Sequence, residues 1–178
     1  MPDSAPFTIR PAVVGDARVI AEIGVAGWRA AYAGTLPADF LAGLKVEPRA
    51  LAWRTRLEMD EEDAPSWVAE AGGRVIGYVS GGPPRDEDVP PPSAEVYAIY
   101  VMPGEWRHGV GRALLSTASA DLQRRGAAML VLWVLEANAA GRAFYEAVGW
   151  RPDGARQLLQ LGGIRIPEVR YRRTTSPS

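Results

Sequence analysis

The apolar residues of this chain recur at spacings that change from segment to segment, and each spacing predicts an element. Residues 94–101 are rich in β-branched and aromatic side chains, a composition typical of a buried strand. Over residues 111–125 the apolar positions fall on one helical stripe, and Gly126 follows two arginines, as at a helix end. Between these segments lies a turn with two glycines, Gly109 and Gly111. The centre of the chain is therefore predicted to be strand, turn and helix.

The same patterns predict the elements on either side of this centre. Before it we expect a strand, a helix, two shorter helical pieces and a hairpin, at residues 7–10, 15–32, 37–44, 48–57, and 66–71 with 74–80. After it we expect a buried strand, a helix and two last strands, at residues 127–135, 139–148, 156–161 and 168–173, with residues 150–154 turning the chain. Together they predict one mixed α/β domain, residues 7–173, with flexible tails at 1–6 and 174–178.

Two segments between these elements are expected to be loops. Residues 81–93 contain five prolines, a density that no regular element tolerates, and residues 59–65 are acidic. The proline-rich loop is either simply solvated or forms the rim of an active site. The sequence leaves both readings open.

Composition narrows the classes of function. The net charge is −1 and Lys45 is the only lysine among 20 basic residues, so nucleic acid is not expected as a partner. The absence of cysteine excludes disulfides, thiolate ligands and a cysteine nucleophile, and with His108 as the only histidine no metal site is expected. No signal peptide and no membrane-spanning run is visible, so we expect a cytoplasmic protein that does not bind membranes.

The central turn is suited to an anion. A loop that leads from a strand into a helix directs several backbone N–H groups, and the positive end of the helix dipole, at one point. The two glycines are followed by Arg112 and Ala113, so the lysine of a P-loop is missing, and Leu114 stands where a dinucleotide-binding motif has its third glycine. A phosphate or diphosphate is expected here, but neither common nucleotide motif is present.

This turn resembles the acetyl-CoA signature of the GCN5-related N-acetyltransferase (GNAT) superfamily. Val101-Met102-Pro103 matches the Val-x-Pro that ends the family's strand, and Gly109-Val110-Gly111 matches its glycine turn. Trp106 stands where the family has Arg or Gln, with Arg107 one step later. The resemblance implies acetyl-CoA as cosubstrate, with its pantetheine arm along the strand and its diphosphate at the turn. It assigns the cofactor to Ile99, Tyr100, Val101, Arg107, His108, Gly109, Val110, Gly111, Arg112, Ala113, Asn138 and Tyr145.

A second resemblance lies downstream. Residues 132–150 are similar to the family's pattern of a strand, an Asn, a helix with Phe-Tyr, and Gly-Phe/Trp three residues later. It implies that Asn138 helps to hold the cofactor arm and that the Tyr145 hydroxyl lies near the thioester sulfur. A plain helix cap for Asn138 and core packing for Tyr145 are the alternatives. Over nearly the whole chain, the resemblance implies a single-domain GNAT fold, a mostly antiparallel mixed sheet of about seven strands flanked by helices.

The chemistry of acetyl transfer explains why a base and an acid are expected in the site. The attacking amine must be neutral. At pH 7 only about one lysine-like amine in a thousand is neutral. Glu95, at the start of the central strand, is the predicted base, acting directly or through water, with a solvated strand-end carboxylate as the alternative. Tyr145 is the predicted proton donor to the departing thiolate, whose own pKa is about 8.5. No covalent intermediate with the enzyme is needed.

The acceptor side is predicted from aromatic residues. Trp28 and Tyr32 lie one turn apart on the first long helix, the region from which the family often builds its acceptor wall, and Tyr97 shares a strand face with Glu95. Acidic residues at 60–63 and 86–88 are expected to attract a cationic amine.

These observations predict an acetyl-CoA-dependent transferase that acetylates a primary amine of a small molecule. The alternatives are a protein or peptide acceptor, a longer acyl group, or a binding module without turnover that senses acyl-CoA. A homodimer is compatible with the sequence.

Overall fold

A computed structural model describes residues 6–59 and 62–174 of the 178 in the chain. Asp60, Glu61 and nearly all of the two predicted tails lie outside the described residues. No helix in the described ranges is long and apolar enough to cross a membrane.

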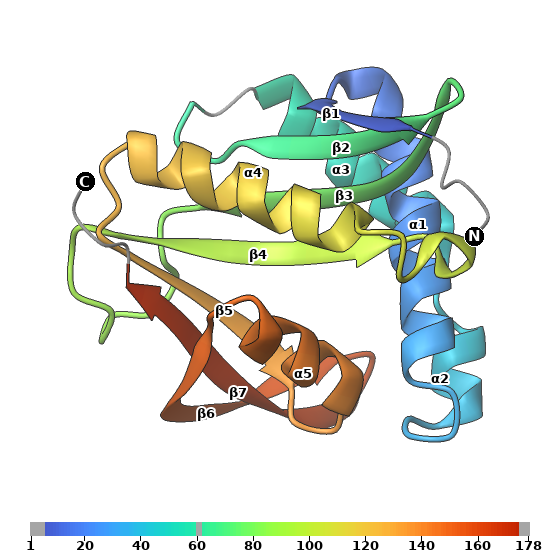
Figure 1. Ribbon diagram of the computed structural model, residues 1–178. Helices are drawn as coiled ribbons and strands as arrows, with labels where there is room; N and C mark the ends of the chain where they lie inside the picture. Colours follow the sequence, from blue (N-terminus) through green and yellow to red (C-terminus); the bar gives the residue numbers. More distant parts are fainter. Residues whose placement is uncertain (1–5, 60–61, 175–178) are drawn as a thin grey trace.

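One seven-stranded sheet organises the described chain (Figure 1). The strands lie side by side in the order β1-β2-β3-β4-β5-β7-β6, and all neighbours are antiparallel except β4 and β5, which are parallel. The predicted mixed sheet is thereby confirmed. Its strands are β1 (Phe7–Pro11), β2 (Ser66–Ala71), β3 (Arg74–Gly82), β4 (Ser93–Val101), β5 (Met129–Leu135), β6 (Arg151–Leu161) and β7 (Ile164–Thr174).

Helices cover both faces of the sheet. In Figure 1, α4 and α5 lie on one face, and α1 and α3 on the other. Short 3₁₀ turns precede α1 and α4, at Val14–Asp16 and Pro103–Glu105. The helices are α1 (Ala17–Ala31), α2 (Ala38–Ala42), α3 (Val46–Met59), α4 (Val110–Arg124) and α5 (Ala139–Ala147).

The apolar stripes predicted for the helices form the core. On α4 the stripe packs against the sheet with Trp150 and Tyr171, and its members Val110, Leu114, Ala118 and Leu122 are all buried. On the opposite face, Ile20 and Ile23 of α1 pack on Val68 and Tyr78. Burial of these side chains holds α4 and α1 in fixed positions on the two faces of β4.

The sheet splits beside β4. Within the described chain, β4 pairs with β5 over Ser93–Val96 and Met129–Leu132, and Figure 1 shows the two strands diverging beyond that point. The β4 register against β3 also slips here, because Val96 faces Gly81 and Ala98 faces Ser80, so Tyr97 is left as a bulge. The C-terminal half of β4 is therefore free along the edge that faces β5.

A separate apolar cluster closes one end of this split. It joins α1, α2, β5 and the β6–β7 hairpin, and its buried members are Val25, Tyr32, Leu41, Leu44, Leu135 and Ile166. The cluster fixes the hairpin tip against α2, where Gly162 lies against the Phe40 ring.

Several predicted boundaries were wrong. The last strand, β7, runs from Ile164 to Thr174 rather than over residues 168–173. Residues 151–154 belong to β6 rather than to a turn, because the register shift between Pro152 and Arg156, with Gly154 at φ 94°, kinks the chain without ending its pairing. The proline-rich loop is shorter than predicted: β3 extends to Gly82 and β4 begins at Ser93.

Candidate active site

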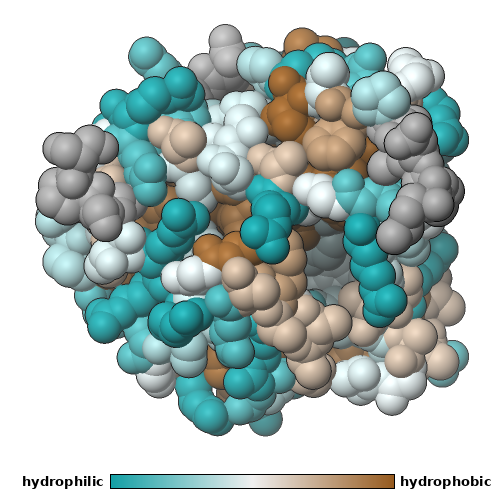
Figure 2. Space-filling model, viewed as in Figure 1, coloured by the Kyte–Doolittle hydropathy of each residue, from teal (hydrophilic) through white to brown (hydrophobic). Residues whose placement is uncertain are grey.

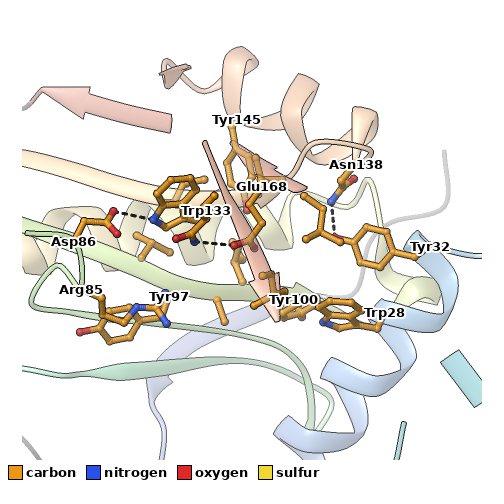
Figure 3. A pocket seen from close by; sticks show the side chains of 18 residues that line it. Trp28, Tyr32, Arg85, Asp86, Tyr97, Tyr100, Trp133, Asn138, Tyr145 and Glu168 are labelled. Atoms are coloured by element: carbon orange, nitrogen blue, oxygen red, sulfur yellow. Dashed lines mark hydrogen bonds between the residues drawn. The ribbon is translucent and has the colours of Figure 1, made fainter. Parts of the chain in front are cut away.

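A cavity of about 430 Å³ lies at the split between β4 and β5. Its walls come from α1, the proline-rich loop, β4, β5, β6, β7, and α5 with its N-cap (Figure 3). Figure 2 shows the surface hollowed between α5 and α1 on the face drawn in Figure 1. The lining residues that carry polar or aromatic groups are Trp28, Tyr32, Arg85, Asp86, Tyr97, Tyr100, Trp133, Asn138, Tyr145, Gln157 and Glu168.

The turn that enters α4 has the backbone of an anion site. Gly109 caps the helix with φ 83°, and Arg107 is also left-handed with φ 66°. The first amides of α4 have no carbonyl of their own helix to bind. A Cβ built on Gly109 meets no atom of the described residues within 4 Å, so there is open space beside the Gly109 backbone. The turn therefore fits a diphosphate.

Trp106 fixes this turn to β4. Its indole Nε1 donates a hydrogen bond to the Val101 carbonyl, at 2.8 Å. The side chain that replaces the family's Arg or Gln thus ties the turn to the end of the strand.

The free edge of β4 runs from the turn into the cavity. Ile99 and Tyr100 line the cavity, whereas Val101 does not. Because the β5 side of this edge has no strand partner within residues 6–59 and 62–174, an extended ligand arm can bind it with backbone hydrogen bonds.

Asn138 links the two sides of the cavity. Its Oδ1 accepts a hydrogen bond from the Gly141 amide at 2.9 Å, which confirms the predicted cap of α5. Its Nδ2 donates to the Tyr32 hydroxyl at 3.2 Å, a contact drawn in Figure 3. Burial raises the pKa of Tyr32 to about 12. Both ends of the Asn138 amide are therefore held in place.

Tyr145 reaches the cavity from α5. Its ring packs against Phe144, Trp150 and Tyr171, so the core-packing alternative and the cavity position hold together. Burial raises the pKa of the Tyr145 hydroxyl well above its usual value of 10, so the group is protonated at neutral pH. A protonated hydroxyl at this position can donate.

Aromatic rings form the wall opposite α5. Trp28 and Tyr32 pack together with ring centroids 4.9 Å apart and planes tilted by 58°, and both line the cavity with Tyr97 and Tyr100. The Arg85 guanidinium lies over the Tyr97 ring, 4.8 Å from its centroid. The wall is therefore aromatic, and two cations, Arg85 and Arg56, lie against its Tyr97 ring.

Glu95 is fully buried and does not line the cavity. Its carboxylate accepts a hydrogen bond from the Arg85 amide at 2.9 Å and forms an ion pair with the Arg85 guanidinium. The Glu95 carboxylate thus binds Arg85 of the proline-rich loop, and its role as base stays a prediction.

Glu168 is the carboxylate that the sequence analysis missed. It projects from β7 into the cavity, is 9% exposed, and accepts a hydrogen bond from Gln157 Nε2 at 2.8 Å. Burial raises the pKa of Glu168 above its ordinary value of 4.5. In sequence it is one acid at the start of a predicted strand, and only the pairing of β7 with β5 and β6 brings it to the cavity.

Comparison with known proteins identifies the fold and the family. Residues 28–150 match the acetyltransferase (GNAT) family. The chain belongs to this family. The Bacillus subtilis (strain 168) protein "Uncharacterized N-acetyltransferase YuaI" is 31% identical over 169 residues, 91% of this chain and 90% of that protein. The "Probable N-acetyltransferase Rv2775" of Mycobacterium tuberculosis is 36% identical over 107 residues, 60% of this chain and 58% of that protein.

Solved structures agree with this assignment. A PaiA N-acetyltransferase from Thermoplasma acidophilum in complex with coenzyme A superposes with a TM-score of 0.75 at 18% identity, covering 96% of this chain and 99% of that one. A ribosomal-protein-alanine N-acetyltransferase from Brucella melitensis gives a TM-score of 0.72 at 25% identity, covering 94% and 99%. The predicted GNAT fold and acetyltransferase class are confirmed.

In this acetyltransferase most of the predicted site residues fall into two groups, whereas Glu95 and Val101 belong to neither. The residues predicted to bind the acceptor, Trp28, Tyr32 and Tyr97, share the cavity with Asn138 and Tyr145, although they lie far apart in sequence. The second group, residues 107–113, forms the turn at the end of β4 and does not line the cavity. The fold thus separates the turn predicted to bind an anion from the cavity predicted to bind the acceptor.

The proline-rich loop of the acetyltransferase is a rim rather than a solvated loop, because Arg85 and Asp86 line the cavity. Asp86 accepts hydrogen bonds from Trp133 Nε1 at 2.8 Å and from Arg170 at 3.0 Å. Arg170, 8% exposed, also pairs with Asp88 and Asp153, each at 2.7 Å. This network fastens the loop to β5, β6 and β7.

Proposed function

We propose that this acetyltransferase transfers the acetyl group of acetyl-CoA directly to a primary amine of a small molecule. The turn at residues 107–113 would hold the diphosphate, and the free edge of β4 would hold the pantetheine arm. The family assignment gives the reaction class. The geometry of the turn into α4 and of the split between β4 and β5 supports this position for the cofactor.

The shape of the cavity is the observation that favours a small molecule as acceptor. At about 430 Å³ it falls in the range of sites that enclose drug-sized ligands. The rim loop is fastened across one side by Arg170, and the cluster of α2 with the β6–β7 hairpin closes another. A small amine fits such an enclosure, whereas a protein segment needs a groove that is open along its length.

The side chains suit direct transfer. Tyr145 is protonated at neutral pH and lines the cavity, and it would give its proton to the departing thiolate. Backbone N–H groups of β4 beside the split would stabilise the developing oxyanion.

The test is release of free thiol from acetyl-CoA over a panel of acceptors, with mass spectrometry of the products. The panel contains phenethylamine, a linear diamine, phenylalanine and a peptide with N-terminal alanine, the kind of acceptor named for the Brucella melitensis structure. We expect the small amines to be acetylated and the peptide to remain unmodified. Turnover with the peptide alone would overturn the small-molecule acceptor, and no turnover with any member would favour the binding module.

A further inference from the structure

We propose that Glu168 binds the ammonium group of the acceptor and takes its proton, which makes the cavity selective for cationic amines that carry no neighbouring carboxylate. This inference rests on the proposed function, because it names the acceptor class and the base for the same site.

The position of Glu168 is the first observation. In Figure 3 its side chain reaches into the space between Tyr145 and Tyr100, and all three line one cavity. Its Oε2 accepts a hydrogen bond from Gln157, which steadies the carboxylate while leaving its other oxygen for a ligand. Glu95 lies on the same side of the sheet, but its two oxygens already bind Arg85. Of these two acids, Glu168 is the one free to meet an acceptor.

The charge around the cavity is the second observation. Among the described residues, three charged side chains line the cavity, the cation Arg85 and the carboxylates Asp86 and Glu168. Arg85 is already paired with Glu95, and Asp86 with Arg170. The acids outnumber the bases, so the site attracts a cation and repels an anion. An amino acid would bring its own carboxylate into this field.

The aromatic wall is the third observation. Six rings line the cavity, those of Trp28, Tyr32, Tyr97, Tyr100, Trp133 and Tyr145. Ring faces attract cations and pack against apolar ligand bodies. The cavity therefore suits an arylalkylamine or an alkylamine, with its ammonium group at Glu168.

The proton balance of the step is complete. Glu168 takes one proton from the ammonium group and later releases it to water. The nitrogen lone pair then forms the C–N bond to the acetyl carbon as the C–S bond breaks. Tyr145 gives its proton to the sulfur and regains the second proton that leaves the nitrogen. The products are the amide, the free thiol and one proton.

The decisive variant is Glu168→Gln, which keeps an oxygen to accept the Gln157 hydrogen bond but removes the charge. With phenethylamine we expect kcat/KM to fall about 100-fold. Glu70→Gln, the same change on β2 where the carboxylate binds Arg10, is the control and should leave kcat/KM unchanged. Glu168→Asp, whose carboxylate sits one methylene further back, should recover part of the rate.

Two further measurements separate a base from a merely structural residue. The wild-type kcat/KM should rise with pH through a group titrating above 4.5, and Glu168→Gln should lose this limb. The groups that act on Glu168 are Arg85, Glu95, Asp86 and Tyr32. If Glu95→Gln rather than Glu168→Gln removes the limb, Glu95 is the base and the proposal is wrong.

Binding of the amine is measured by calorimetry without acetyl-CoA, so it does not depend on turnover. We expect phenethylamine to bind about tenfold more weakly to Glu168→Gln, and phenylalanine to bind wild type about tenfold more weakly than phenethylamine, the scale of one lost charge contact. Equal binding in either comparison would overturn the proposal. If wild type releases no thiol with any amine, while phenethylamine still binds through Glu168, the proposed acetyl transfer is wrong. The role of Glu168 in binding the ammonium group is then unaffected.

Discussion

At the scale of single residues, the Tyr145 hydroxyl is proposed to donate the proton that the departing thiolate needs. Phenylalanine keeps the ring packing with Trp150 and Tyr171 but removes the proton. We expect Tyr145→Phe to lower kcat about 100-fold while the Kd for acetyl-CoA stays nearly unchanged. Steady-state kinetics and calorimetry measure the two quantities, and an equal loss of both would contradict the role as acid.

Asn138 offers a test of stability beside one of function. Asn138→Ala removes the oxygen that caps α5, so the free energy of unfolding should fall by about 1 kcal/mol in a urea titration. Asn138→Ser keeps a capping oxygen but cannot reach Tyr32 with an amide. We expect the serine variant to retain most of the stability. If serine and alanine are equally destabilising, the contact to Tyr32, rather than the cap, carries the effect.

Replacement of Glu168 is expected to lower activity without lowering stability at pH 7. Because its folded pKa lies above 4.5, its unfolded value, folding disfavours the ionised form, and this penalty is present at neutral pH and absent well below pH 4.5. Glu168→Gln should therefore unfold at the same temperature as wild type or a higher one at pH 7, despite its lost activity. A lower melting temperature at pH 7 would show that the carboxylate has a structural role.

At the scale of elements, the turn into α4 is tested by a pair of glycines. Gly109 and Gly73 both have positive φ, 83° and 74°, and a Cβ on either meets no atom within 4 Å. Backbone strain from a side chain is therefore similar at the two sites, about 1–2 kcal/mol. We expect Gly109→Glu to abolish acetyl-CoA binding in calorimetry, because a carboxylate would occupy the phosphate position, and Gly73→Glu to preserve it. Equal binding by the two variants would show that the cradle is misplaced.

The elements that the sequence predicts well are those with a local signal. α4 has an apolar stripe and a glycine at its N-cap, and α5 has Asn138 at its start, so their bounds were predicted to within about two residues. The start of β6 was missed because its pairing depends on a bulge at Gly154 and on the partner strand β7. Such pairing is a property of two distant segments, and neither one shows it alone.

At the scale of the whole molecule, Arg170 is the residue that joins the rim loop to the C-terminal strands. Arg170→Met leaves Asp86, Asp88 and Asp153 without their cation, so we expect the free energy of unfolding to fall by about 3 kcal/mol. Arg172→Met, on the same strand and exposed, should change it by less than about 0.5 kcal/mol. Calorimetric or urea unfolding measures both, and equal losses would show that the network does not fasten the loop.

The candidate site was predicted in part for the same physical reason. Asn138, Tyr145 and the glycine turn lie in compact motifs, so the resemblance could place them directly. Glu168 reaches the cavity only through the order of strands β5, β7 and β6, and Arg170 finds its acids on two separate segments. Long-range pairing is what the sequence pattern does not reveal.

The most direct test of the central claim is a crystal structure of the protein with acetyl-CoA. We predict that the diphosphate lies against the backbone amides of residues 107–113, with the pantetheine arm along the free edge of β4 and the thioester beside Tyr145 at the split. A diphosphate bound elsewhere, with this turn free of ligand at saturating acetyl-CoA, would contradict it.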